Sequence, residues 1–520
     1  MFSFRHLALF TALLLMPLAA IADLFEDAVQ GLDARSFSDK EVAVGNLTAI
    51  SDQRVPAILR AMLEGDLYAR KSDGRVVVAR RDGRRYQVTD PLSGEDLGML
   101  TSRELSKIVV NNQLRARLRA TMAELNLSAP TPAVRLASVN ELIDRPDPEL
   151  ADALRAALER EDDRRVREAL ATAIALVELE SSDPEIRQQA IEVLAGSLES
   201  SVRNALNRLA LNDPEQDLRQ IAAAAVRHIE FKFQLYDWVE TVFFGLGLGA
   251  VLVLAAIGLA ITFGVMGVIN MAHGELIMLG AYTTYLIQQL LPRQIEWSLA
   301  LAVPAAFVVS GLVGIAIERG VIRFLYGRPL ETLLATFGIS LILQQLVRTL
   351  ISPQNVPVSN PSWMSGSLEL NPALTLTLNR LYIIAFCLIV FALLLAVMRR
   401  TRLGLEVRAV AQNRAMARAM GVRSARVDAL TFGLGSGIAG VAGVALSQLT
   451  NVGPNLGQSY IIDSFMVVVF GGVGNLWGTL VAGMSLGVIN KFLEPWSGAV
   501  LAKILVLVFI ILFIQKRPRG

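Results

Sequence analysis

Two patterns of apolar and polar positions divide the chain. The second half contains nine apolar segments joined by short polar connections, and about 20 apolar residues suffice to cross a bilayer. The nine segments are 241–262, 275–291, 298–318, 331–350, 381–398, 428–448, 459–473, 477–493 and 499–514. We therefore predict an all-α fold whose residues 236–520 form a polytopic helical membrane domain of about nine spans.

Short amphipathic helices are predicted in residues 131–235. Five segments begin near an Asp or Ser, place an Arg two or three residues later, and continue with Ala and Leu on one helical face. They read AVRLASVNEL, RVREALATAI, EIRQQAIEVL, SVRNALNRLA and DLRQIAAAAV. Such units bury their apolar stripes by stacking, so the pattern indicates HEAT-like repeats, with a plain helical bundle as the alternative.

The preceding region, residues 23–130, has mixed character. Apolar positions in residues 42–67 recur at helical spacing, and two β-like runs, 76–79 and 86–88, flank Asp82-Gly83. Asp-Gly is a favoured hairpin turn because glycine accepts the positive φ of a type I′ turn. We expect a small two-stranded β-hairpin between helices.

The first 22 residues have the pattern of a secretory signal peptide. Arg5 and His6 precede an apolar core, and Ala20-Ile21-Ala22 offers a cleavage site of small residues. The alternative is an uncleaved first membrane helix. In either case the following helical domain is expected in the periplasm.

The distribution of Lys and Arg agrees with this orientation. The net charge of +2 does not indicate a nucleic-acid partner, but the basic residues gather in alternate connections. The predicted cytoplasmic segments hold Arg319, Arg323, Arg328, Arg399, Arg400, Arg402, Arg408, Arg414, Arg418, Arg423, Arg426, Lys516, Arg517 and Arg519. An odd number of spans after a periplasmic domain then places the C-terminus in the cytoplasm of a bacterium, and the membrane domain in its inner membrane.

Several kinds of chemistry are not supported by the sequence. Cys387 is the single cysteine and three histidines are scattered, so neither a disulfide nor an ordinary metal site is expected. The GxGxxG pattern at 435–440 lies inside an apolar span with no preceding strand, so close helix packing explains it better than a dinucleotide site. No GxxxxGK[ST] phosphate loop occurs, so we expect no catalytic residue and no cofactor.

Two glycine-rich breaks interrupt the apolar half. The first, GVMGVINMAHGELIML at 264–279, contains Asn270, His273 and Glu275, and polar groups at membrane depth are costly unless they face a bundle interior or a wet path. The second reads GGVGNLWG at 471–478. Paired interrupted spans favour a substrate path near the membrane centre. The alternatives are helix caps at the membrane surface for the first break and an ordinary tight turn for the second.

A polar segment at 401–426 lies between spans on the predicted cytoplasmic side. It predicts a short amphipathic helix whose small and apolar face holds Val407, Val410 and Ala415, with a stop at Gly421. Such a helix could dock into a groove of a cytoplasmic partner or lie on anionic lipid, and composition leaves both open.

Four motifs, in this order, resemble the permease subunits of branched-chain amino acid type ABC importers. They are GLAITFGVMGVINMAHGELIMLGAY, LLATFGISLILQQ, the TRLG…RAVAQNRAMARAMGV loop and GGVGNLWGTLVAG. The resemblance covers residues 240–515. Within this family, a signal peptide followed by a periplasmic helical domain resembles the B permease subunit of urea importers.

The resemblance implies a heterodimer with a second permease, two cytoplasmic ATPase subunits that bind the ATP, and a periplasmic solute-binding protein. It assigns a translocation path to Asn270, His273, Gly274, Glu275, Gly471, Gly472 and Gly474. We add Thr336 and Gln344, whose polar side chains suit such a path. The resemblance assigns a coupling helix, which sits in an ATPase groove, to Arg408, Ala409, Gln412, Asn413, Ala417, Met420 and Gly421.

The expected function is a permease that moves urea or a close amide inward. Urea is small and neutral, so polar side chains without a fixed counter-charge suit it, whereas an amino acid zwitterion favours complementary charge or helix termini. One alternative is the same transporter class carrying branched-chain amino acids. Others are a membrane-anchored periplasmic scaffold and a channel or ion-coupled transporter.

Overall fold

The structure is a computed structural model that describes residues 24–50, 52, 54–83 and 85–516. The predicted signal peptide at 1–22 lies outside the described residues. The chain divides into two compact units, Met1–Phe231 and Lys232–Gly520, and the division falls within helix α10 (Gln216–Met266). Each unit is described by itself.

The first part of unit 1 packs helices around a small sheet, so the fold is not all-α. The helical elements are η1 (Gly31–Asp33), α2 (Phe37–Ala49), α3 (Val55–Glu64) and α4 (Asn112–Leu127). The strands are β1 (Leu67–Arg70), β2 (Val76–Asp82), β3 (Arg85–Thr89), β4 (Asp96–Leu100) and β5 (Leu105–Lys107). They form one antiparallel sheet in the order β4-β3-β2-β1-β5.

The predicted hairpin is present but is only the centre of that sheet. Ala79 of β2 pairs with Val88 of β3, and Gly83 takes a φ of 60° in the turn. The prediction of two strands was wrong because the three further strands are 4, 5 and 3 residues long. Strands this short carry too few alternating apolar positions to stand out.

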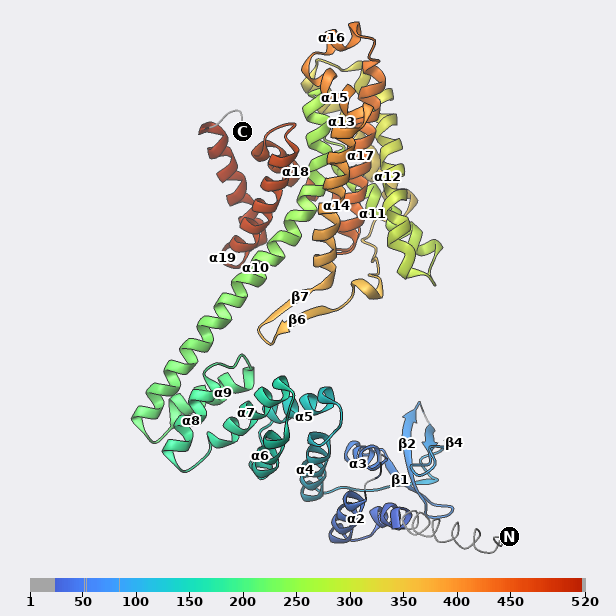
Figure 1. Cartoon of the computed structure of the whole chain (residues 1–520). Coiled ribbons are helices and arrows are strands. Elements are labelled where there is room, and N and C mark those ends of the chain that lie inside the picture. Colours follow the sequence, from blue (N-terminus) through green and yellow to red (C-terminus); the bar gives the residue numbers. More distant parts are fainter. Residues whose placement is uncertain (1–23, 51, 53, 84, 517–520) are drawn as a thin grey trace, which may run out of the picture. The chain divides into compact units, whose positions relative to one another are not determined.

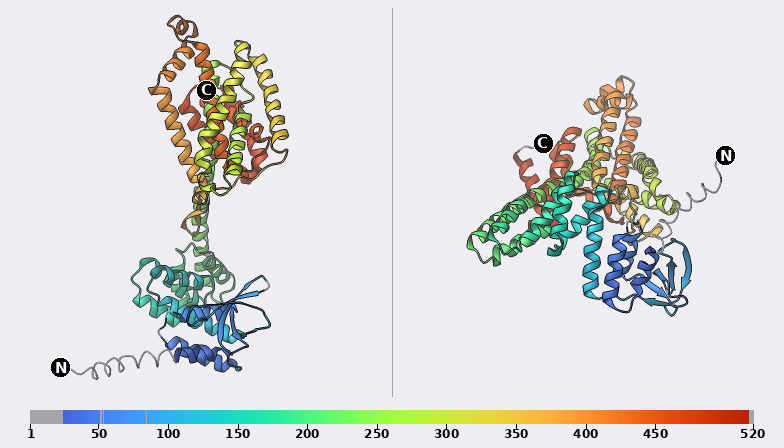
Figure 2. Two further views of the ribbon diagram at one scale, coloured as in Figure 1. Left: turned by 90° about the vertical axis from the view of Figure 1, so that its right-hand side faces the viewer. Right: turned by 60° about the horizontal axis from the view of Figure 1, so that its bottom comes forward.

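Helices stack in the rest of unit 1 (Figures 1 and 2). They are α5 (Pro132–Asp144), η2 (Pro148–Leu150), α6 (Ala151–Arg160), α7 (Arg164–Glu178), α8 (Pro184–Leu194) and α9 (Ser200–Asn212), followed by the start of α10. Asp147, Asp163 and Asp183 cap η2, α7 and α8 through side-chain oxygens. Each helix buries one apolar stripe, with Val139, Leu154 and Leu170 almost fully covered.

A repeated ion pair reveals the period of this stack. Arg135 forms a two-pronged pair with Glu161, and Arg187 forms the same pair with Asp213, with 26 residues between the partners in each case. In each case the arginine also donates to the carbonyls five and six residues before it. The pattern returns after 52 residues, a distance that covers three helices.

Unit 2 is helical apart from one hairpin that the sequence analysis missed. Its elements after α10 are α11 (His273–Leu290), α12 (Ile295–Gly320), η3 (Ile322–Phe324), α13 (Pro329–Leu350), η4 (Ser362–Met364), β6 (Ser367–Asn371), β7 (Leu374–Thr377), α14 (Leu378–Arg400), α15 (Arg402–Gln412), α16 (Arg414–Ala419), α17 (Ser424–Ser447), α18 (Leu456–Gly471) and α19 (Leu476–Lys516). The hairpin β6–β7 and the pair α15–α16 lie at opposite ends of this unit (Figure 1).

Six helices in the described part of the chain are long and apolar enough to cross a membrane. They are α10, α12 with η3, α13, α14, α17 and α19. The last contains two of the nine predicted spans, since Gly498, at a φ of 76°, kinks it. The remaining two predicted spans fall in α11 and in the 16-residue α18.

Helix α17 lies at the centre of unit 2. Its 24 residues are nearly all buried, and its small residues let neighbouring backbones approach closely. A Cβ added at Gly280 of α11 would overlap the carbonyl of Gly440, and one added at Gly443 would overlap that of Ile277. The expected role of the 435–440 glycine row in helix packing is therefore confirmed.

Candidate functional site

The first glycine break separates α10 from α11. Helix α10 ends at Met266, Gly267 takes a φ of 65°, and residues 267–272 are not helical. Helix α11 then begins with His273, whose Nε2 lies 2.8 Å from the carbonyl oxygen of Ala255. Ala255 is eleven residues before the end of α10, a rise of about 16 Å. The chain therefore folds back along α10 before α11 starts, and α11 begins deep inside the unit.

Glu275, in the first turn of α11, is bound by two polar side chains of α13. Its Oε1 accepts hydrogen bonds from Ser340 Oγ at 3.0 Å and from Gln344 Nε2 at 2.7 Å. The residue is 1% exposed, and its Oε2 has no hydrogen-bond partner among the described residues. A buried carboxylate with one free oxygen is costly to keep, which points to a use other than stability.

Helix α13 presents its polar side chains inward. Thr332, Thr336, Ser340 and Gln344 recur every four residues and are all buried, whereas the opposite face exposes large apolar side chains such as Leu334, at 70%. Thr336 Oγ1 also accepts a hydrogen bond from the backbone N–H of Met271 in the break. A helix with polar side chains inside and apolar ones outside is typical of membrane proteins that enclose a polar route.

The polar residues of the break point to different neighbours. Asn270 Oδ1 accepts from the N–H of Ala272, the residue before α11, while His273 faces α10 and Glu275 faces α13. Gly274 packs against the backbone of Gly457 in α18. The structure therefore joins Glu275 to Gln344, and the backbone of the break to Thr336, whereas Asn270, His273 and Gly274 make other contacts.

The second glycine break forms a turn between α18 and α19. Gly472 and Gly474 have φ values of 87° and 80°, and Asn475 Oδ1 accepts from the N–H of Gly478 at the start of α19. Gly471 packs against the backbone of Gly478. Gly474 of this turn packs against Gly264, near the end of α10. The break has the geometry of a tight, partly exposed turn.

The predicted coupling helix is broken in two. Helix α15 ends at Gln412, Asn413 is extended with φ −152° and ψ 97°, and its Oδ1 then caps α16 through the N–H of Met416. The prediction of one helix was wrong because an Asn side chain competes with the helical backbone bonds and favours a cap. Gly421, with a φ of 87°, ends the segment as predicted.

The face of α16 that packs inward also differs from the prediction. Ala417 is 5% exposed and lies with Val407, Val410 and Val427 in a small apolar cluster of unit 2 itself. Met420 is 78% exposed instead, as is Met416 at 60%. Among the other predicted coupling residues, Arg408 and Gln412 are exposed and Ala409 is half-buried.

Residues 241–514 match a known protein family. The family model of the branched-chain amino acid transport system permease component matches residues 241–514. The chain belongs to this permease family. The high-affinity branched-chain amino acid transport system permease protein LivH of Salmonella typhimurium is 30% identical over 296 residues, which are 55% of this chain and 96% of LivH.

Two further relatives of the permease cover the same region. The branched-chain amino acid permease protein BraD of Pseudomonas aeruginosa is 31% identical over 298 residues, or 55% of this chain and 96% of BraD. The ribose import permease protein RbsC of Escherichia coli is 24% identical over 249 residues, or 46% of this chain and 73% of RbsC. No solved structure matches the chain.

The sequence analysis missed Ser340 as a partner of Glu275. The signal was available, since Thr332, Thr336, Ser340 and Gln344 stand four residues apart in an apolar span and so share one helical face. The sequence alone did not show which helix packs against that face. The contacts join residues 65 and 69 positions apart.

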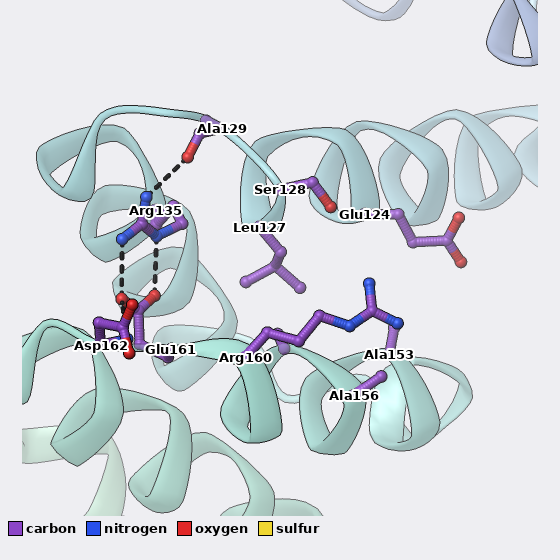
Figure 3. Close-up of a pocket in the computed structure, with 11 residues that line it drawn as sticks. Glu124, Leu127, Ser128, Ala129, Arg135, Ala153, Ala156, Arg160, Glu161 and Asp162 are labelled. Atoms are coloured by element: carbon purple, nitrogen blue, oxygen red, sulfur yellow. Dashed lines mark hydrogen bonds and ion pairs between the residues drawn. The ribbon is translucent and has the colours of Figure 1, made fainter.

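Unit 1 of the permease holds a polar pocket at its repeated ion pair. Figure 3 shows Arg135 directed at Glu161 and at the carbonyl of Ala129, with Arg160 and Glu124 on the opposite wall. The Arg135 guanidinium and nearby backbone N–H groups lower the pKa of Glu161 to about 2. In the described residues no group of His, Cys, Asp and Glu could hold a metal ion.

Proposed function

We propose that this permease is the translocation subunit of an ATP-driven importer of branched-chain or other amino acids. The contact between the first break and the polar face of α13 carries the proposal, because it places hydrogen-bonding groups along the interior of an otherwise apolar unit. The relatives named for branched-chain amino acids support this substrate better than urea, the substrate expected from the sequence.

The proposed route runs past Glu275, Gln344 and Thr336. Glu275 Oε2 is a free acceptor, and the free Nδ2 of Asn270 is a donor in the same segment. Acceptors and donors of this kind suit a solute that bears both an ammonium and a carboxylate group. The second break, at 471–474, contributes a turn that lets the end of α10 and the start of α19 approach each other.

We further propose nine membrane crossings with the N-terminal unit in the periplasm and the C-terminus in the cytoplasm. Contacts between the segments that connect the helices support a chain whose successive helices cross the membrane in opposite directions. On the side of α15–α16, the ring of Tyr326 lies 5.1 Å from the Arg414 guanidinium, and Gly264 touches Gly474.

On the opposite side, three other connections meet: those between α11 and α12, α13 and α14, and α17 and α18. Val356 forms a bridge with Val452, Gln288 hydrogen-bonds with Ser359, and Glu296 accepts from the N–H of Ser362. The connections that share contacts are thus those that an alternating path of nine crossings places on the same side of the membrane. The basic residues gather on the side of α15–α16, as expected for a cytoplasmic side.

The exposed part of α16 is proposed to dock onto an ATPase subunit. Met416 and Met420 stand out from the unit next to the exposed Arg408 and Gln412, and flexible apolar side chains with a basic border suit a groove on a protein partner. The complex would comprise a second permease, two ATPase subunits and a periplasmic solute-binding protein. No phosphate-binding loop occurs in the sequence, so ATP hydrolysis is assigned to the partners.

Urea remains the second candidate substrate because of unit 1. The match to the permease family begins at residue 241, so the whole of unit 1 lies outside it. A long helical extension before the permease is the architecture that favoured urea in the sequence.

Solute uptake by the complete complex in proteoliposomes decides between branched-chain amino acids and urea. With ATP inside, labelled leucine should accumulate, and a hundredfold excess of unlabelled urea should leave that accumulation unchanged. Accumulation of labelled urea that excess leucine leaves unaffected would reverse the substrate assignment. Absence of any ATP-dependent uptake of either solute, in a complex that contains its ATPase subunits, would refute the transport proposal for both.

A further inference from the structure

Two arginines fix the short helix α16 to the first turns of α17. Arg414 donates from Nη1 to Asp428 Oδ2 at 2.6 Å and from Nη2 to Oδ1 at 3.0 Å, while Arg418 Nε donates to Ser424 Oγ at 2.7 Å. The two arginines are four residues apart, and so are their two partners. Successive turns of α16 are therefore bound to successive turns of α17.

The pair of Arg414 and Asp428 is the stiffer of these links. The side chain of Asp428 is 1% exposed and that of Arg414 is 30% exposed, so the bond lies at the inner edge of the unit. A two-pronged guanidinium–carboxylate pair fixes both distance and orientation, which a single hydrogen bond does not. The ring of Tyr326, in the connection after α12, lies 5.1 Å from the same guanidinium and holds it from another side.

A second buried carboxylate lies near Asp428. Glu318, near the end of α12, is 1% exposed, and its Oε2 has no hydrogen-bond partner among the described residues. Asp428 and Glu318 are close enough to act on each other electrostatically. Arg414 therefore ties α16 to α17 and to the connection after α12, beside a buried carboxylate that lies 3.7 Å from Arg319 Nε.

Helix α17 leads from this point to the proposed route. Its glycines pack directly against the backbone of α11. A sideways movement of α17 therefore has to displace α11 or break this contact. On α11, Leu276 is the neighbour of Glu275, and its carbonyl accepts a hydrogen bond from Ser310 of α12 at 3.0 Å. Helix α17 thus contacts α16 through Asp428, and it contacts α11, the helix that carries Glu275, through its glycines.

We infer that Arg414 is a positioning residue whose paired bonds to Asp428 make α17 follow α16 when the ATPase subunits move. The inference rests on the proposed docking of α16 onto an ATPase. It assigns to Arg414 the transmission of movement and not the docking itself, since the exposed Met416 and Met420 provide the docking face. Energetic coupling between distant sites requires such a physical connection, and a test must measure the coupling directly.

The test compares solute uptake with ATP hydrolysis in proteoliposomes of the complete complex. Arg414→Gln should keep basal ATP hydrolysis within twofold of the unmodified complex, lose its stimulation by solute-loaded binding protein, and lower uptake per ATP at least tenfold. Asp428→Asn should do the same. Arg414→Lys retains the charge without the two-pronged geometry, so its uptake per ATP should lie between those of the unmodified complex and Arg414→Gln. The matched control is Arg426→Gln, which removes an exposed arginine from the first turn of α17 and should leave uptake per ATP unchanged.

A charge exchange separates transmission from simple folding defects. The double variant Arg414→Asp with Asp428→Arg should recover at least a third of the uptake per ATP that either single variant loses. Unchanged uptake per ATP in Arg414→Gln would overturn the inference. Loss of the ATPase subunits from the purified Arg414→Gln complex would also overturn it, because Arg414 would then set docking. Failure of the unmodified chain to co-purify with ATPase subunits would instead count against the proposed function.

Discussion

Replacing Glu161 by Gln should destabilise the helical repeats of unit 1 by about 3 kcal/mol. The Glu161 side chain is 3% exposed and accepts two hydrogen bonds of 2.7 Å from Arg135. It also accepts from the N–H groups of Asp162 at 3.1 Å and Asp163 at 2.9 Å. Gln keeps the size and one acceptor oxygen but removes the charge from a buried pair.

The magnitude follows from the pKa of the Glu161 carboxyl. The hydrogen bonds from Arg135, followed by those from the backbone, lower this pKa from 4.5 to about 2 although burial alone would raise it. That difference corresponds to about 3 kcal/mol between the charged and neutral forms. Because the folded state has the lower pKa, the stabilisation is complete above the unfolded value and is lost as the pH falls from about 5 toward 2.

Thermal unfolding of the full chain in detergent measures the effect. The melting temperature of unit 1, followed by hydrogen exchange of the α5 and α7 amides, should fall by about 6–12 °C at pH 7. The difference should be about half as large at pH 3 and approach zero only below about pH 2. The matched control is Glu168→Gln on α7, which removes a 64% exposed partner of Arg164 and should change stability by less than about 0.5 kcal/mol. Equal effects of the two variants, or a difference that persists unchanged at pH 3, would refute the reasoning.

Three further changes test unit 2. Glu275→Leu should lower solute uptake at least tenfold, because it leaves two buried donors without an acceptor, whereas Glu275→Gln retains an acceptor oxygen and should retain more uptake. Gly280→Val should lower the yield of folded protein by forcing α11 from α17, a cost of at least about 1–3 kcal/mol, while Gly338→Val, where nothing lies within 4 Å, should not. Met416→Asp should reduce co-purification of the ATPase without loss of thermal stability, whereas Ala417→Asp should lower the melting temperature because Ala417 is buried.

The long apolar runs predicted the helices of unit 2 because burial and membrane crossing both select uninterrupted apolar residues. The predicted segment 331–350 lies inside α13, and 381–398 lies inside α14. The break after α10 was predicted because glycines together with Asn270 and Glu275 are incompatible with an uninterrupted apolar span. The spans and the break depend only on which residues occur within about 20 consecutive positions, so they can be recognised in the sequence.

One local competition and several features that depend on distant partners were predicted wrongly or missed. The break at Asn413 is a local competition between capping and helix continuation, in a segment otherwise rich in helix-forming residues. The burial of Ala417 depends on Val427 across a turn, and the bond from Ser340 to Glu275 depends on how α13 lies against α11. Periodicity identifies the face of a helix but does not say which neighbour covers it.

The position of Glu275 also bears on how the permease can open. A carboxylate held by two side chains of α13 and free at its other oxygen is bound on one side only. Helix α13 touches the rest of the unit mainly through its polar face, and its apolar face is exposed, so it is the element whose departure costs the least apolar contact. Helix α11, by contrast, is locked to α17 through glycine contacts that leave no room for sliding. Opening by movement of α13 away from α11 would expose Glu275, Thr336 and Gln344 together. A disulfide that joins α11 to α13 should then abolish uptake and leave ATP binding intact, whereas continued uptake would require a route elsewhere in unit 2.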